Sequence, residues 1–93
     1  MEHDPSARLR IDKWLVHARF CKTRSVAVEL VGKGRVRVNR RPVRKPSYEL
    51  KPGDVLTLPR GGSVAVVRVV AMGVRRGPAT EARLLYEELV PAH

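Results

Sequence analysis

The sequence predicts an α+β domain in which two packed N-terminal helices lie on a small twisted antiparallel sheet, followed by a short C-terminal helix. Three observations predict it: two early segments with apolar residues at helical spacing, an alternation of arginine and valine after them, and two later glycine-containing turns between β-branched runs. With 43% hydrophobic and 30% charged residues, the 93-residue chain is typical of one small folded domain.

The first predicted helix has its apolar residues at i, i+3, i+4 and i+7, which places them on one face. These residues are Ile11, Trp14, Leu15 and Ala18. We expect this face, with the Trp14 side chain, to belong to the core. Asp12 lies in the first turn, where an acid is favoured by the helix dipole.

The second predicted helix begins after Thr23 or Ser25, because either side chain can act as an N-cap. Its buried stripe consists of Ala27, Leu30 and Val31. Two glycines that follow, at positions 32 and 34, provide the C-terminal stop.

Residues 35–38 alternate between arginine and valine, which predicts a strand with its valines on one face. Asn39 and Arg40 occupy the turn, and because arginine is strained in left-handed backbone we expect a turn wider than the two-residue Asn-Gly type. Pro42 indicates that the returning strand lies at an edge of the sheet.

The second half of the chain predicts a hairpin and a final helix. Residues 51–54, Lys-Pro-Gly-Asp, match a type II turn before a strand over 55–58. Residues 60–63 then turn into a longer strand over 63–70. The last helix is expected to start near Thr80, after Pro78. Its apolar face would hold Ala82, Leu85, Tyr86 and Leu89.

Positive charge is concentrated in the first half of the sequence. Residues 8–51 contain fourteen Lys and Arg against three acids, a balance of +11, whereas the rest of the chain has a balance of −1. Such a concentration indicates an anionic partner, and phosphate backbones are the commonest one.

Within residues 19–45 there are ten bases and one acid, on predicted helices and strands alike. If the helices and strands each form one layer, we expect these groups to converge on one surface that follows a phosphate backbone. Thr23, Ser25, Asn39 and Ser47 add neutral donors. The charged candidates are Arg19, Lys22, Arg24, Lys33, Arg35, Arg37, Arg40, Arg41, Arg44 and Lys45.

Several function classes find no support in the sequence. It has no paired carboxylates, nucleophile triad, phosphate-binding loop or zinc spacing, so we expect no catalytic residue, no metal and no cofactor. Cys21 is the single cysteine and is interpreted as an inert thiol. The longest apolar runs are broken by Arg68, and the N-terminus does not resemble a signal peptide. We expect a cytoplasmic monomer that does not bind membranes.

Four separated blocks resemble, in the right order, the RNA-binding domain named after small-subunit ribosomal protein S-four. The blocks are Arg10-Ile11-Asp12-Lys13-Trp14-Leu15, Ala18-Arg19-Phe20-Cys21-Lys22-Thr23-Arg24-Ser25, Gly34-Arg35-Val36-Arg37-Val38-Asn39 and Lys51-Pro52-Gly53-Asp54. The resemblance implies an αL motif, in which two helices and a short β element bind structured RNA. One departure is Arg40, at a position where this family usually has glycine.

The resemblance also implies domain limits and contact residues. The match covers residues 8–58 as an S-four-type domain; the residue pattern itself predicts a flexible tail over 1–7 and a completing hairpin and C-terminal helix over 59–93. The residues implied to contact RNA are Arg10, Lys13, Arg19, Lys22, Thr23, Arg24, Ser25, Lys33, Arg35 and Arg37.

Trp14 and residues 75–79 and 81–87 are similar to the heat-shock protein 15 branch of this family. Members of that branch associate with the large ribosomal subunit, in rescue of subunits blocked by a nascent chain attached to tRNA. The expected partners are therefore large-subunit ribosomal RNA, tRNA and the ribosome. Three alternatives stay open: an RNA-specificity subunit of an RNA-modifying enzyme, a ribosome-assembly factor, and a binder of membrane surfaces or acidic proteins.

Overall fold

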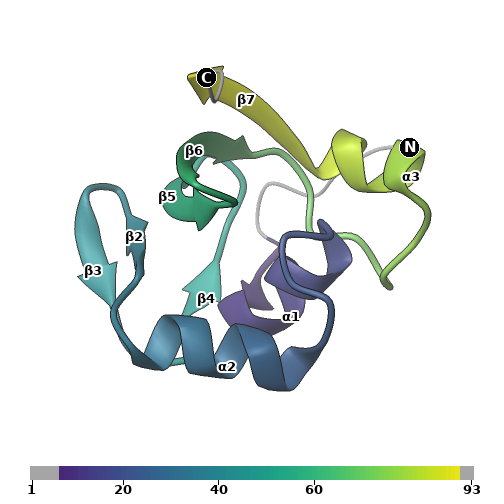
Figure 1. Ribbon diagram of the computed structural model, residues 1–93. Helices are drawn as coiled ribbons and strands as arrows, with labels where there is room; N and C mark the ends of the chain where they lie inside the picture. The colour runs from purple at the N-terminus through teal and green to yellow at the C-terminus, as the bar shows by residue number, and fades with distance from the viewer. Residues whose placement is uncertain (1–6, 91–93) are drawn as a thin grey trace.

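The computed structural model describes residues 7–90 and has two layers, a pair of helices and an antiparallel sheet (Figure 1). This arrangement confirms the α+β prediction. The elements in chain order are β1 (Leu9–Arg10), α1 (Ile11–His17), α2 (Arg24–Gly32), β2 (Val36–Val38), β3 (Arg41–Val43), β4 (Glu49–Leu50), β5 (Val55–Arg60), β6 (Ser63–Val69), α3 (Ala79–Ala82), the 3-10 helix η1 (Arg83–Leu85) and β7 (Tyr86–Val90). No helix within residues 7–90 is long and apolar enough to cross a membrane.

Helices α1 and α2 form where the apolar spacing predicts them. All four residues of the predicted apolar face of the first helix are buried. Of the two candidate N-caps for α2, the structure uses Thr23, whose Oγ1 accepts a hydrogen bond from the Val26 N–H at 3.3 Å. Ala27 and Val31 are buried, and Leu30 is half-buried against the same core.

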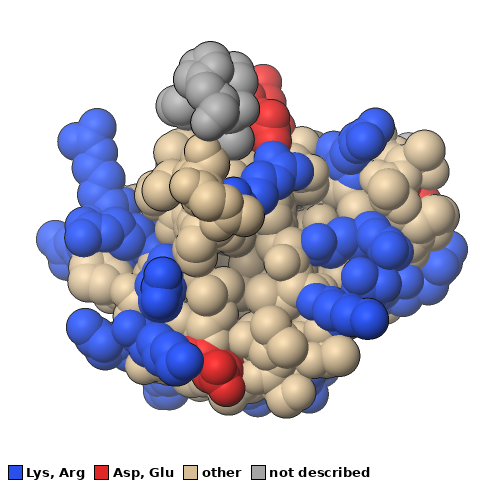
Figure 2. Space-filling view, viewed as in Figure 1, with Lys and Arg blue, Asp and Glu red and all other residues tan. Residues whose placement is uncertain are grey.

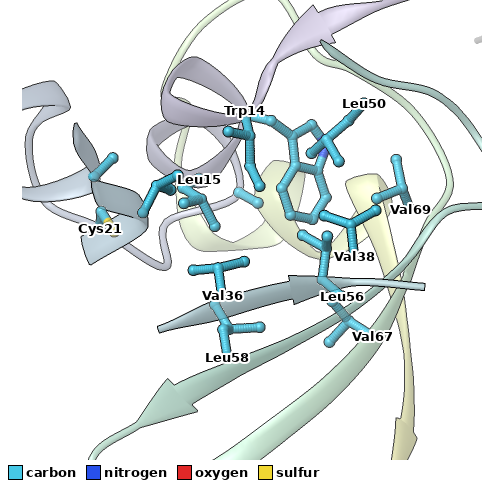
Figure 3. Packing of buried hydrophobic residues seen from close by; sticks show 14 of the residues in the cluster. Trp14, Leu15, Cys21, Val36, Val38, Leu50, Leu56, Leu58, Val67 and Val69 are labelled. Carbon is cyan, nitrogen blue, oxygen red and sulfur yellow. The ribbon is translucent and has the colours of Figure 1, made fainter. Parts of the chain in front are cut away.

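Trp14 lies at the centre of the core between the helices and the sheet. Figure 3 shows its ring pointing from α1 toward the sheet, with Val38, Leu50 and Val69 around it. Its indole N–H donates to the carbonyl of Ala71 at 2.9 Å, so the one polar atom of this fully buried side chain is satisfied.

The main sheet has five strands in the order β3-β2-β5-β6-β7, and every pair is antiparallel. Val36 and Val38 are buried and Arg37 between them is exposed, as the alternation predicts. Strand β3 is an edge strand, in agreement with the position of Pro42. The sheet therefore packs one face against the helices and keeps charged groups on the other.

The β2–β3 turn is tighter than the sequence predicts. Val38 pairs with Arg41, so the loop has only two residues, and both have positive φ, 51° at Asn39 and 75° at Arg40. These angles are those of a type I′ turn, and the expectation of a wider turn is wrong. The physical reason is the Asn39 amide, whose Oδ1 accepts from the Val55 N–H at 3.0 Å and whose Nδ2 donates to Asp54 at 3.1 Å.

The predicted C-terminal helix is only partly present. Helix α3 and the 3-10 turn η1 end at Leu85, and Tyr86–Val90 is strand β7, paired with β6. A helix here would leave the edge of β6 that faces away from β5 unpaired, and the strand also places Tyr86 against Phe20, with ring centroids 4.8 Å apart. The prediction of a helix through Leu89 is therefore wrong.

Two further strands carry no sequence signal because each has two residues. Strand β1 pairs with β4 through Leu9 opposite Leu50. The Ile11 N–H donates to the Tyr48 carbonyl at 2.7 Å, which ties the start of α1 to the loop before β4.

The turn over residues 51–54 has the predicted type II geometry, with φ of 96° at Gly53 and the Asp54 N–H donating to the Lys51 carbonyl. The Asp54 carboxylate is 1% exposed and accepts from Asn39 Nδ2, the Lys51 N–H and Lys51 Nζ. Burial raises the pKa of Asp54, but these hydrogen bonds and the Lys51 charge outweigh burial and place that pKa below its ordinary value.

Replacing Arg40 by glycine is expected to stabilise the protein. Left-handed backbone costs a non-glycine residue about 1–2 kcal/mol, and the extra chain entropy of glycine offsets about 0.5–1 of that. We expect R40G to raise the free energy of unfolding by up to about 1 kcal/mol in urea titrations. The control R41G, in extended strand backbone, should lower it; a destabilised R40G would contradict the type I′ assignment.

Asp54→Asn is expected to lose about 1–3 kcal/mol of stability at pH 7, because an amide cannot accept all three hydrogen bonds. A carboxyl with a lowered folded pKa stabilises the protein above its unfolded pKa, 3.8, and this contribution disappears as pH falls through the folded value. The wild-type advantage over D54N should therefore be constant from pH 7 to about 5 and shrink below about 4. Urea unfolding at several pH values measures it, with the exposed Glu29→Gln as control; a pH-independent difference would contradict the assignment.

Candidate nucleic-acid interface

The predicted contact residues lie around the two ends of α2. Figure 1 shows α2 running from the α1 side to the β2–β3 hairpin, a path of about 14 Å at 1.5 Å per residue. Thirteen of the fourteen residues are exposed, and Arg10 is half-buried. Figure 2 shows Lys and Arg side chains gathered on both sides of the view with uncharged surface between them. The contact residues thus form two groups, and the convergence of both groups on one RNA-binding surface stays a prediction.

We call the first group the junction cluster, since it surrounds the α1–α2 turn. It consists of Arg10, Lys13, Arg19, Lys22, Thr23, Arg24 and Ser25. The second group is the hairpin cluster, from the end of α2 to the loop after β3. It consists of Lys33, Arg35, Arg37, Asn39, Arg41, Arg44 and Lys45.

Asp12 is a buried acid that pairs with two arginines of the junction cluster. Its carboxylate is 0% exposed and accepts two hydrogen bonds from Arg10, at 3.1 and 2.9 Å, and one from Arg24 Nε at 3.3 Å. The two arginine side chains remain 40% and 50% exposed. Arg10 and Arg24 can therefore bind the buried acid on one side and present remaining N–H groups to a phosphate on the other.

The pKa of the Asp12 carboxyl is set by opposing effects. Burial raises the pKa, but the hydrogen bonds and positive charges of Arg10 and Arg24 outweigh burial and lower it below its ordinary value. Asp12 is therefore a carboxylate at neutral pH, and it fixes both guanidinium groups. The sequence placed Asp12 in a helix turn but did not reveal this bond to a residue twelve positions later.

The other members of the junction cluster differ in the contacts that their side chains make with the rest of the protein. Lys13 and Lys22 are exposed and make no ion pair within residues 7–90. Thr23 and Ser25 lie 3.2 Å apart through their hydroxyl oxygens. Arg19 has a positive φ of 66° and donates to the Gly77 carbonyl at 2.7 Å, which connects the α1–α2 turn to the segment before α3.

The hairpin cluster presents its charges in several directions. Lys33 pairs with Glu29 one helical turn away. Arg37 lies on the face of β2 opposite the buried valines, beside Thr57 of β5. The guanidinium of Arg44 lies against Gly34. A Cβ atom on residue 34 would come within 2.5 Å of this guanidinium. Gly34 thus allows the loop after β3 to approach the end of α2.

Asn39 is the predicted contact residue least suited to that role. Both ends of its side-chain amide are used inside the protein, toward Val55 and Asp54. Arg40 at the tip of the turn is exposed and has no hydrogen bond or ion pair with the described residues. In the I′ turn the Asn39 amide is therefore engaged by Asp54 and Val55, whereas the Arg40 side chain is free in solvent.

The chemistry of this surface is that of anion binding. Within the described part of the chain, no three His, Cys, Asp or Glu side chains lie together in a way that could hold a metal ion. Cys21 is buried, and burial raises the pKa of its thiol, so it stays protonated at neutral pH. Exposed guanidinium and ammonium groups on short rigid elements are the groups that bind phosphates.

Comparison with known sequences agrees with this geometry. Residues 9–56 match the S4 domain, a segment that covers both helices and continues into β5. The chain is 43% identical over 88 residues to heat shock protein 15 of Escherichia coli, which covers 95% of this chain and 65% of that protein. It is 38% identical over 61 residues to the RQC P-site tRNA stabilizing factor of Bacillus subtilis, covering 66% of this chain and 70% of that factor. The chain thus spans less than two thirds of the E. coli relative.

A solved structure gives the same result for the fold. The trimeric structure of Vibrio cholerae heat shock protein 15 superposes with a TM-score of 0.83 at 38% identity, covering 88% of this chain and 82% of the other. Because that relative was solved as a trimer, the expected monomer stays a prediction for this chain. From the matched segment and these relatives, the chain belongs to the S4 domain family.

Proposed function

We propose that this protein is a non-catalytic, cytoplasmic RNA-binding protein that docks on structured ribosomal RNA of the large subunit. One observation supports the proposal most: exposed basic groups without internal partners lie at both ends of a rigid helix in an S4 domain. The unpaired lysines of the junction cluster and the exposed Arg35, Arg40 and Arg41 of the hairpin are the groups available to phosphates.

The mechanism is electrostatic docking oriented by shape. The two clusters lie about one short helix apart, so they can bind phosphates on separate segments of a folded RNA. Few amide or carboxylate side chains suited to base edges accompany the basic ones, and A-form RNA is recognised mainly through shape and backbone. The protein should therefore prefer a particular RNA geometry over a particular sequence.

The relatives direct the proposal to one state of the ribosome. One group is named for stabilising tRNA in the P site, and the other for heat shock. We propose that this chain acts on large subunits blocked by a nascent chain still attached to tRNA, with ribosomal RNA bound by one cluster and tRNA within reach of the other.

Neutralising Lys22 should lower the salt dependence of binding to purified large subunits. Each lost phosphate contact reduces the slope of log affinity against log salt by about one. We expect K22Q to show this change, whereas R68Q, on the outer face of β6 and paired with Glu87, should keep the wild-type slope. Equal slopes for K22Q and wild type would mean that Lys22 does not contact phosphate.

Reversing two charges of the junction cluster should abolish co-sedimentation with large subunits. Lys13→Glu with Lys22→Glu is the suitable pair, because neither lysine has an internal partner among residues 7–90. Arg24 is not suitable, since a glutamate there would face buried Asp12 and unfold the domain. Circular dichroism should show an intact fold. A folded double variant that still co-sediments would place the interface elsewhere.

A further inference from the structure

A small pocket is lined by only one of the fourteen predicted contact residues, Arg19. It has a volume of about 250 Å³ and lies between the α1–α2 turn, the end of β5 and the α3–β7 segment. Its lining includes three arginines, Arg19, Arg60 and Arg83, and two aromatic side chains, Phe20 and Tyr86. Pockets for whole small-molecule ligands are usually about 300–1,000 Å³, so this pocket suits a single chemical group.

Two of the three guanidinium groups are fixed by contacts inside the protein. Arg60 lies over the Phe20 ring, 5.5 Å from its centroid, and forms an ion pair with Glu88. The Phe20 ring in turn packs on Tyr86. Arg19 is fixed by its hydrogen bond to the Gly77 carbonyl. A guanidinium has five N–H donors, so each keeps donors for a ligand after these contacts.

Arg83 supplies a charge without a carboxylate partner among residues 7–90. Its backbone N–H caps α3, but its exposed guanidinium has no hydrogen bond or ion pair with the described residues. Glu88 offsets Arg60, which leaves the charges of Arg19 and Arg83 in excess around the pocket. Fixed donors around an excess of positive charge are the arrangement that binds a phosphate group, since guanidinium forks match its oxygens.

We propose that this pocket binds a backbone phosphate of the RNA that the junction cluster holds. This inference rests on the proposed function. Arg19 belongs both to the junction cluster and to the pocket, so one RNA backbone can pass from the α1–α2 turn to η1 without leaving charged surface. The pocket thereby extends the interface to the C-terminal half of the chain, where residues 52–93 hold five bases against four acids.

The test compares Arg83→Gln with two reference variants in binding to purified large subunits over a range of salt. R83Q should lower the slope of log affinity against log salt by about one, as K22Q does, and R83Q with K22Q should lower it by about two. R68Q removes the same charge from the outer face of the sheet and should leave the slope unchanged. A normal slope for R83Q beside a lowered slope for K22Q would overturn the pocket and leave the proposed function standing.

A second measurement separates the pocket from the proposed function and from a site for free phosphate. Inorganic phosphate is titrated into wild type and R83Q while the arginine Nε–H resonances are followed by NMR. Saturable shifts at Arg19, Arg60 and Arg83 that R83Q abolishes would support a phosphate pocket even if wild type failed to bind subunits. No saturable shift would overturn it. Saturable shifts with an unchanged R83Q salt slope would assign the pocket to free phosphate and overturn its role in RNA binding.

Discussion

The buried bond between Asp12 and two arginines is the constraint on which the RNA-binding geometry depends. It joins Arg10, at the start of α1, to Arg24, at the start of α2, through a carboxylate with no exposed surface. Removing either arginine would leave the buried carboxylate with the other arginine alone and with fewer of the charge-assisted hydrogen bonds that offset its burial. The starts of the two helices are therefore held together, and this fixes the backbone positions of the lysines beside them. Arg10 and Arg24 are structural residues as well as surface charges.

The fold could be predicted from the sequence wherever a pattern of residue types extends over several positions. The apolar face of α1, the alternation at Val36–Val38 and the type II turn at Gly53 each carry their own signal, and the structure confirms each. Strand β7 could not be predicted in this way, because Leu85, Tyr86 and Leu89 fit a helical face as well as a buried edge. The segment forms a strand because its backbone pairs with β6 and because Tyr86 packs on the Phe20 ring. Such long-range demands override local periodicity.

The candidate site could be predicted in its membership but not in its arrangement. Charge counting found the exposed bases, because a run of arginine and lysine is exposed in almost any fold. It could not show that Asn39 turns its amide inward, since this depends on Asp54, fifteen residues away. Nor could it show that Arg37 lies beside Thr57, because that follows from how β2 pairs with β5.

The distribution of ion pairs explains why the two halves of the chain behave differently. Three arginines of the C-terminal half each have a carboxylate partner elsewhere in that half. The pairs are Arg60 with Glu88, Arg68 with Glu87 and Arg75 with Glu81. Because β7 supplies two of these acids, forming that strand also pairs Arg60 and Arg68 with carboxylates. Most of the uncompensated charge lies around α2 and the β2–β3 hairpin, and such an asymmetric field orients an approaching polyanion toward them. Arg83 lines the same pocket as Arg19, so the positive potential extends from the helices to the C-terminal half. A helix in place of β7 would move Glu88 away from Arg60, and the pocket would lose the contact that fixes this guanidinium.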